Sequence, residues 1–287
     1  MTSPRGTAVI TGAGSGIGRA LSRLCADRGY DLALFDINGE ELQTIADDAR
    51  AQGVTVTART LDVADEQAIL QAAEEVEQEH GAVRFLFNNA GVAMGGFFEH
   101  NGSRDFRWLM EINFFGVVHM TRAFLPLLRR QNGPAQIVNI SSIFGIIAPV
   151  GQTAYSAAKF AVRGFSESLR HELEGSSVGV TVVHPGGVAT NIAKRAKISP
   201  VLPKELVAAQ QAQAEKSLSM PPTRAAQLIL DAAERGDPRL LIGKDARTLA
   251  MIQRCFPTRY WKILKNIPGF KTALGAREVP STRTSNP

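Results

Sequence analysis

The stretch TGAGSGIG at residues 11–18 decides the fold prediction for this chain of 287 residues. It follows a short apolar run at 8–10, typical of a buried strand, and leads into a helical pattern near 16–28. Glycines let a strand–helix turn close tightly, and they let the backbone approach a pyrophosphate at the helix N-terminus. The spacing of Gly12, Gly16 and Gly18 therefore favours nucleotide binding, with an ordinary glycine-rich turn as the alternative.

The rest of the chain repeats this alternation of short apolar runs and longer helical patterns, which is typical of βαβ units. Strands are predicted at 8–10, 32–35, 54–59, 84–87, 136–140, 178–184 and 239–242. Helices are predicted at about 16–28, 40–51, 65–79, 104–130, 153–173 and 224–235. We therefore predict the α/β class, with a doubly wound (Rossmann) parallel sheet of about seven strands and helices on both faces. One dinucleotide-binding and catalytic domain would span 1–245, followed by a basic extension at 246–287 with a disordered end.

The composition is that of an ordinary globular protein, with 44% hydrophobic and 21% charged residues. The two cysteines, Cys25 and Cys255, lack CxxC spacing, and the five histidines lack ligand spacing. We therefore expect no disulfide framework and no metal site. No signal peptide pattern and no apolar run of ~18 residues is present in the sequence, so we expect a cytoplasmic protein.

The positive charge is concentrated at the C-terminal end. From Arg239 onward there are 10 basic and 2 acidic residues, whereas the preceding 238 residues carry 22 basic and 25 acidic ones. This distribution argues against nucleic-acid binding by the main domain. In 249–270, basic and apolar residues alternate, which favours docking on the domain or a partner subunit over contact with an anionic membrane.

Asp36 ends the second predicted strand, 20 residues after Gly16. A carboxylate at this place binds the adenosine ribose hydroxyls and repels a 2′-phosphate. Neither Ser15 nor Ile37 supplies a cation for that phosphate. The pattern favours NAD(H) over NADP(H), and the alternative is a solvent-facing aspartate that caps the next helix.

Tyr155 and Lys159 are four residues apart, which places both side chains on one face of the predicted helix. A nearby ammonium would lower the phenol pKa toward the working pH of a general acid/base. Such a pair alone is more often structural. Ser142 lies 13 residues before Tyr155, just beyond the strand at 137–140, where ligands bind in parallel sheets.

In combination, these motifs resemble the short-chain dehydrogenase/reductase family over roughly residues 5–245. The resemblance rests on TGAGSGIG at 11–18, NNAG at 88–91, Asn113, SS at 141–142, YSAAK at 155–159 and HPGGVAT at 184–190. It implies that Tyr155 is the acid in reduction and the base in oxidation, and that Lys159 lowers its pKa and holds the nicotinamide ribose. It further implies that Ser142, rather than Ser141, orients the substrate oxygen. Asn113 would hold a water that connects Lys159 to bulk solvent.

The resemblance also implies a set of residues around a nicotinamide dinucleotide. Asp62 and Val63 would lie at the adenine, and Val188 and Thr190 at the carboxamide. Without the resemblance, Asp62 is simply an acid before a helix, and 88–91 is an ordinary turn. The implied cofactor residues are Gly12, Ser15, Gly16, Ile17, Gly18, Asp36, Asp62, Val63, Asn89, Ala90, Gly91, Tyr155, Lys159, Pro185, Gly186, Val188 and Thr190.

The sequence thus predicts an NAD(H)-dependent oxidoreductase that interconverts a secondary alcohol and a ketone. Apolar residues at 92–98 and 144–148 favour a lipophilic or bulky substrate. A lid predicted at about 190–222 adds Ile192, Ile198, Val201, Leu202, Leu206 and Val207, which alternatively only pack the lid onto the domain.

Two other functions remain open. An NADPH-dependent 3-oxoacyl or carbonyl reductase is disfavoured by Asp36, and a non-catalytic cofactor sensor or scaffold is disfavoured by the presence of Tyr155 and Lys159. Relatives pair through the two long helices, here 104–130 and 153–173, so we expect a homodimer or homotetramer.

Overall fold

The computed structural model describes residues 5–198, 208, 212, 218–267 and 270. Seven parallel strands form one sheet in the order β3-β2-β1-β4-β6-β7-β9. The sheet confirms the predicted fold class. Its strands are β1 Thr7–Thr11, β2 Asp31–Asp36, β3 Val56–Thr60, β4 Val83–Asn88, β6 Ala135–Ile140, β7 Val178–Pro185 and β9 Arg239–Ile242.

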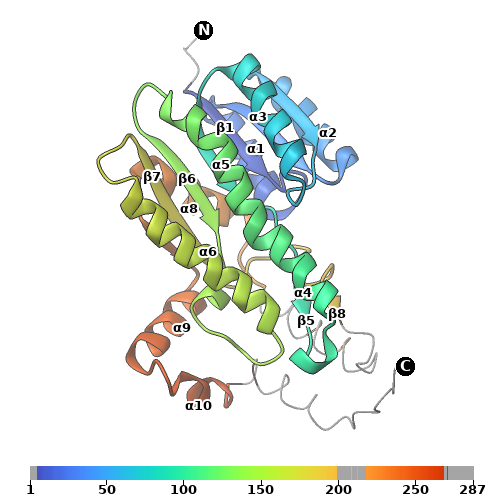
Figure 1. Ribbon diagram of the computed structural model, residues 1–287, viewed down its shortest axis with the longest axis vertical. Helices are drawn as coiled ribbons and strands as arrows, with labels where there is room; N and C mark the ends of the chain where they lie inside the picture. The colour runs from blue at the N-terminus through green and yellow to red at the C-terminus, as the bar shows by residue number, and fades with distance from the viewer. Residues whose placement is uncertain (1–4, 199–207, 209–211, 213–217, 268–269, 271–287) are drawn as a thin grey trace.

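Helices cover both faces of the sheet (Figure 1). Successive side chains of a strand point to opposite faces. Ile10 therefore packs with α1 (Gly16–Asp27), α2 (Gly39–Arg50) and α8 (Pro222–Arg235), whereas Val9 packs with α3 (Glu66–His80) and α5 (Gly116–Arg129). The remaining long helix, α6 (Thr153–Glu172), lies against β7 on the α5 side of the sheet.

The chain reverses its winding direction at β1, which lies between β2 and β4. The connection after β1 enters α1 on one face, while the connection after β4 leads to helices on the other face. Open α/β sheets bind ligands at such a switch point, beyond the carboxyl ends of the strands. The fold therefore locates a candidate site at the ends of β1 and β4.

The helix predicted at 104–130 is interrupted. It consists of α4 (Ser103–Met110), a π-helical turn at Glu111–Phe115 and α5. Asn113 is the central residue of the π-helical turn. Single π turns widen a helix and often occur at functional sites.

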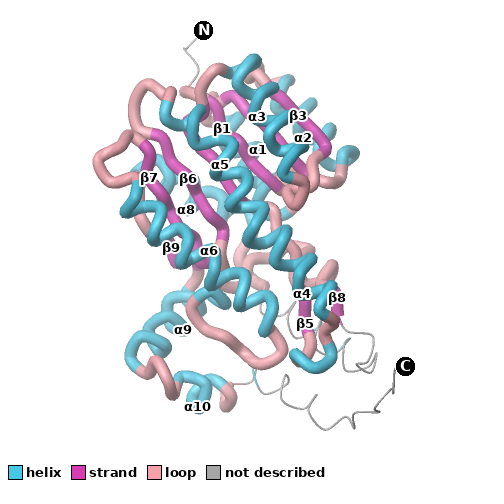
Figure 2. The backbone as a smooth tube through the Cα atoms, viewed as in Figure 1, coloured by secondary structure: helices cyan, strands magenta, loops and turns pink. Residues whose placement is uncertain are grey.

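Two smaller features were not predicted. Strand β5 (Met94–Gly95) pairs in parallel with β8 (Lys197–Ile198), more than 100 residues later in the chain. Two further helices, α9 (Lys244–Cys255) and α10 (Tyr260–Leu264), follow β9; they lie at the end of the sheet toward which the strand arrows of Figure 1 point, and Figure 2 shows them in the same view. The segment 249–270, in which basic and apolar residues alternate, thus contains the end of α9 and the whole of α10.

In the predicted lid, residues 199–207, 209–211 and 213–217 lie outside the described residues, as does the chain end at 271–287. The lid residues Val201, Leu202, Leu206 and Val207 belong to this group. No helix in the described part of the chain is long and apolar enough to cross a membrane.

Candidate functional site

The glycine-rich turn lies at the carboxyl end of β1 and opens α1. Gly12 and Gly16 have φ angles of +66° and +52°, which glycine adopts at little cost. A Cβ at Gly18 would overlap the carbonyl oxygen of Gly12, so the third glycine permits the helix to pack closely on the turn. The first N–H groups of an α-helix have no hydrogen-bond partner inside the helix. Among the described residues, the side chain of the N-cap residue Ser15 does not bind any of them. The turn therefore leaves N–H groups available to an anion.

The carboxylate of Asp36 is held beside this turn. Its Oδ2 accepts a hydrogen bond from the backbone N–H of Gly14 at 2.8 Å, and its Oδ1 accepts one from the N–H of Asn38 at 2.9 Å. The adjacent side chain of Ile37 is 69% exposed. The two N–H groups fix the carboxylate at the end of β2, while Ile37 offers an apolar surface beside it.

Arg19 is a cation near Asp36 that the sequence analysis did not identify. Its Nε donates to the carbonyl oxygen of Gly14 at 2.7 Å, and its guanidinium lies 3.8 Å from a carboxylate oxygen of Glu41. Although neither Ser15 nor Ile37 carries a charge, Arg19 supplies a positive charge in the first turn of α1, directly after Gly18. Glu41 partly balances that charge.

The turn after β4 is joined to the turn after β1. The Thr11 hydroxyl oxygen accepts hydrogen bonds from the N–H groups of Asn89 and Ala90, both at 3.0 Å. The Asn89 side chain donates to the carbonyl oxygens of Thr11 at 2.9 Å and Gly12 at 3.3 Å. These bonds tie NNAG to the glycine-rich turn at the switch point.

Tyr155 and Lys159 occupy the first two turns of α6, beside the end of β6. The Lys159 Nζ donates to the carbonyl oxygen of Ile140 at 3.0 Å and lies 5.8 Å from the centre of the Tyr155 ring. Ser142 follows β6, and its hydroxyl accepts a hydrogen bond from the N–H of Phe144 at 3.1 Å. The structure thus brings the Tyr, Lys and Ser motifs to one edge of the sheet.

The protonation behaviour of this pair differs from the prediction. Burial raises the pKa of the Tyr155 phenol, and the Ser142 hydroxyl acts in the opposite direction. Burial also lowers the pKa of Lys159 to about 8. The net shift of the Tyr155 pKa is therefore upward and not downward as expected, because burial disfavours both charged forms.

Asn113 is fully buried, and its side chain makes two hydrogen bonds to the backbone of one residue, Val92. Oδ1 accepts from the N–H of Val92 and Nδ2 donates to the Val92 carbonyl, both at 2.8 Å. A Cβ at Gly91 would lie 3.2 Å from Asn113 Oδ1 and 3.5 Å from Lys159 Nζ. Gly91 thus lies between Asn113 and Lys159.

His184 is a further residue of the site region, and the sequence had suggested no role for its side chain. It is fully buried at the end of β7, and its Nδ1 lies 2.9 Å from the carbonyl oxygen of Ser142. Burial, the dominant cause, lowers the pKa of His184 to about 4. The neutral ring with its proton on Nδ1 therefore donates to Ser142. The position of His184 before Pro185, at the end of the strand next to β6, is the feature of the sequence that could have indicated this contact.

The remaining predicted cofactor residues lie at the same edge of the sheet. The N–H of Leu61 donates to the Asp36 carbonyl at 2.9 Å, which places Asp62 and Val63 beside the end of β2. Asp62 itself accepts from the N–H of Ala64 in a local turn. Pro185 and Val188 are buried, and Gly186 lies between them. The roles of these residues, like those of Ser15 and Ile17, stay predictions.

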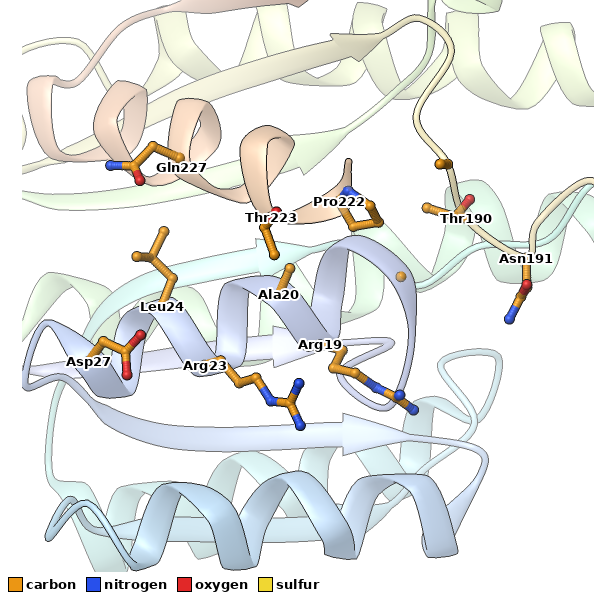
Figure 3. Close-up of a pocket in the computed structure, with 12 residues that line it drawn as sticks. Arg19, Ala20, Arg23, Leu24, Asp27, Thr190, Asn191, Pro222, Thr223 and Gln227 are labelled. Carbon is orange, nitrogen blue, oxygen red and sulfur yellow. The ribbon is translucent and has the colours of Figure 1, made fainter. Parts of the chain in front are cut away.

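A cavity of about 500 Å³ adjoins the glycine-rich turn (Figure 3). It lies between α1 and the start of α8, and Figure 3 shows Arg19 and Arg23 on one side and Thr190 and Asn191 near its end. A Cβ at Gly16 would lie 3.1 Å from Thr190 Cγ2, so the 190 segment packs directly on the turn. The cavity is not lined by Tyr155 or Ser142 and thus borders the glycine turn rather than the Tyr-Lys pair.

Comparisons with known proteins agree with this geometry. Residues 6–199 match the short chain dehydrogenase family model. A Mycobacterium tuberculosis protein with the name "Putative oxidoreductase SadH" is 38% identical over 260 residues, covering 90% of this chain and 93% of the relative.

Solved structures show the same fold. A short-chain dehydrogenase/reductase from Burkholderia phymatum in complex with NAD is 31% identical with a TM-score of 0.81, covering 90% of this chain and 95% of that one. An alcohol dehydrogenase from the archaeon Thermococcus sibiricus, complexed with 5-hydroxy-NADP, is 26% identical with a TM-score of 0.71. It covers 83% of this chain and 95% of that one. From the fold, the arrangement of its motifs and these similarities, we conclude that the chain belongs to the short-chain dehydrogenase/reductase family of oxidoreductases.

Proposed function

We propose that this protein is an NAD(H)-dependent oxidoreductase that interconverts a secondary alcohol and a ketone, with Tyr155 as the acid/base. The observation that carries the proposal is the convergence of Ser142, Tyr155 and Lys159 near Gly91, in the turn that is hydrogen-bonded to the glycine-rich turn. A proton-transferring phenol next to a dinucleotide site is the combination that alcohol–ketone redox chemistry needs.

The residues around the turn fit a dinucleotide. The N-terminus of α1 would hold the pyrophosphate, and Val188 and Thr190 would hold the carboxamide. Asp36 would accept the ribose hydroxyls, and the exposed side chain of Ile37 offers an apolar surface for the adenine. A bound nicotinamide would supply the hydride acceptor for alcohol oxidation or the hydride donor for ketone reduction.

The protein's own groups would control the proton. In oxidation, the Tyr155 oxygen would take the proton of the substrate hydroxyl while Ser142 holds the substrate oxygen by a hydrogen bond. In reduction the same proton returns to the substrate oxygen. Lys159 would supply the positive charge that offsets the effect of burial on the tyrosinate, and it would hold the nicotinamide ribose.

NAD(H) is proposed as the cofactor because the Asp36 carboxylate, held at the end of β2 beside the glycine-rich turn, would repel a 2′-phosphate. An NADPH-dependent carbonyl or 3-oxoacyl reductase is the second candidate, favoured by the Arg19 guanidinium beside Gly14. Glu41, which partly neutralises Arg19, reduces the attraction for that phosphate. The two solved relatives described above include one with NAD and one with an NADP derivative.

The surroundings of Tyr155 support a lipophilic substrate. Phe144 contacts the Tyr155 ring edge-on, with the ring centres 6.2 Å apart. Tyr155 also packs in an apolar cluster with buried Met94 and Leu109 and with Val92. An apolar wall beside the phenol suits an alkyl or aryl alcohol better than a sugar.

We further propose a homodimer or homotetramer that associates through α5 and α6. Phe115 precedes α5, Phe160 lies on α6, and their side chains are 39% and 38% exposed. A closed symmetric contact would bury both rings.

Parallel fluorescence titrations of the purified protein with NADH and NADPH test the proposal. Tight NADH and weak NADPH binding is the expected result, followed by NAD⁺ reduction with a lipophilic secondary alcohol such as 2-octanol. Preference for NADPH would favour the carbonyl reductase. Binding of neither dinucleotide would favour the non-catalytic scaffold.

A further inference from the structure

The C-terminal helices pack on the loop that follows Ser142. Ile143, Ile146 and Ile147 are at most 5% exposed, and they form one cluster with Ala246 of α9 and Leu264 of α10. The partly buried members of this cluster are Phe144, Leu241, Leu249, Ala250, Ile252, Tyr260, Trp261 and Phe270. The apolar side of the loop at 143–147 is therefore covered by α9 and α10.

A hydrogen bond also joins α10 to the end of this loop. The Tyr260 hydroxyl at the start of α10 accepts from the backbone N–H of Ala148 at 3.1 Å. Phe144, in the same loop, contacts the Tyr155 ring. A shift of residues 143–148 would therefore change the surroundings of Ser142 and Tyr155.

Helix α9 contacts a second loop of the site. The Asp245 carboxylate, in the first turn of α9, accepts from the N–H of Gly187 at 2.8 Å. A Cβ at Gly186 would overlap this carboxylate, so glycine at 186 permits the approach. Two and three residues later the same loop reaches Ala189 and Thr190, of which Thr190 packs on Gly16 of the cofactor turn.

We propose that α9 and α10 form a clamp that fixes both loops beside the Tyr-Lys pair, with Tyr260 and Asp245 as positioning residues. The term clamp denotes residues 244–264. Tyr260 fixes residues 143–148 and thereby the substrate side, whereas Asp245 fixes residues 186–190 and thereby the cofactor side. The assignment of these two sides depends on the function proposed above.

The two contacts lie on different elements and so predict separable effects. Loss of the Tyr260 hydroxyl releases one N–H in the 143–148 loop without changing the packing of the ring. Loss of the Asp245 carboxylate releases the N–H of Gly187 and leaves the 143–148 loop in place. Substitution of a residue that only stabilises the fold would not affect one loop and leave the other unchanged.

The experiment compares Tyr260→Phe, Asp245→Ala and Asp245→Asn with the unchanged protein. Met251→Ala is the control, since Met251 lies on α9 with a side chain that is 60% exposed. Three quantities are measured: amide hydrogen exchange of residues 143–148 and 186–190, the Kd for NADH, and the KM for 2-octanol.

For Tyr260→Phe we expect faster exchange at 143–148 alone and a KM raised about 2- to 10-fold, the effect of one net hydrogen bond, with the Kd for NADH unchanged. For Asp245→Ala we expect faster exchange at 186–190 alone and a Kd for NADH raised about 2- to 10-fold. Asp245→Asn keeps an oxygen acceptor and should restore most of the binding.

Unchanged exchange in both loops, or equal changes in all variants including Met251→Ala, would overturn the clamp. The exchange measurement needs neither substrate nor turnover. If the unchanged protein does not oxidise 2-octanol, that result counts against the proposed substrate, while the exchange data still decide on the clamp.

Discussion

The imidazole Nδ1 of His184 lies 2.9 Å from the carbonyl oxygen of Ser142, so a fully buried histidine on β7 holds the backbone of the proposed substrate-orienting serine. The Nε2 atom of His184 has no hydrogen-bond partner among the described residues. A charged ring there would lose its hydration without gaining a counter-ion in contact, which explains why burial lowers the pKa of His184 to about 4.

This pKa shift predicts a pH dependence of stability. Because the pKa of His184 is about 4 in the folded protein against 6.5 as its ordinary value, the unfolded chain binds more protons between those pH values. The free energy of unfolding should therefore be fully retained above pH 6.5 and fall as the pH decreases from 6.5 toward 4, by about 3 kcal/mol in total. Urea unfolding at pH 7 and pH 5 measures the change, and His184→Gln should lose less stability between them. An equal loss in both proteins would contradict this assignment. His80, whose pKa is also lowered by burial, contributes equally to both.

Asp36 should control the choice between the two dinucleotides. Asp36→Ala removes the carboxylate but keeps the backbone of the turn, so NADPH binding should strengthen while NADH binding weakens. We expect the ratio of their Kd values to change at least about tenfold. The variant would lose the charge repulsion against the 2′-phosphate of NADPH and the two hydrogen bonds to the ribose hydroxyls of NADH. Asp47→Ala, which removes an exposed carboxylate on α2, is the control. If the ratio stays the same in Asp36→Ala, the carboxylate does not reach the ribose.

Lys159 should not tolerate replacement by arginine. Its Nζ is held between the Ile140 carbonyl and Gly91, and a larger guanidinium would displace one of them. Both Lys159→Ala and Lys159→Arg should lower kcat/KM for alcohol oxidation at least about 100-fold, within the range of general acid–base catalysis. Steady-state kinetics, with Lys262→Ala as the exposed control, measure the effect. Near-normal turnover in Lys159→Arg would mean that any cation suffices there.

Gly164 tests the proposed subunit contact. It lies in α6, one helical turn after the exposed Phe160, and a Cβ at Gly164 would meet no described atom within 4 Å. If α6 packs on a partner subunit, Gly164→Trp should give monomers by light scattering. Leu70→Trp is the control, because Leu70 is 41% exposed on α3. An unchanged mass for Gly164→Trp would exclude α6 from the contact.

The sequence predicted the sheet and its order of elements because the decisive patterns are local. The apolar run at 8–10 and the glycines after it specify a strand, a turn and a helix start within about 20 residues. The motif residues could be assigned to one edge because carboxyl ends of parallel strands meet there. Among these residues, the structure brings Ser142, Tyr155 and Lys159 together beside the end of β6, while Asp36 lies at the end of β2.

The contacts that were missed connect residues far apart in the chain. Tyr260 meets Ala148 across 112 positions, and Asp245 meets Gly187 across 58. The periodicity of the sequence does not predict such a contact, because the contact depends on how α9 and α10 fold back on the site. The direction of the Tyr155 pKa shift was wrong for a similar reason. Spacing shows which charges are near, whereas burial depends on the whole fold.

The measurement that tests the central claim most directly is turnover of Tyr155→Phe with a lipophilic secondary alcohol, beside its Kd for NADH. The substitution removes one hydroxyl and keeps the ring that packs against Phe144. We predict a kcat lowered at least about 100-fold and a Kd for NADH changed less than about threefold. A Tyr155→Phe protein that oxidises the alcohol at close to the original rate would contradict the assignment of Tyr155 as the acid/base.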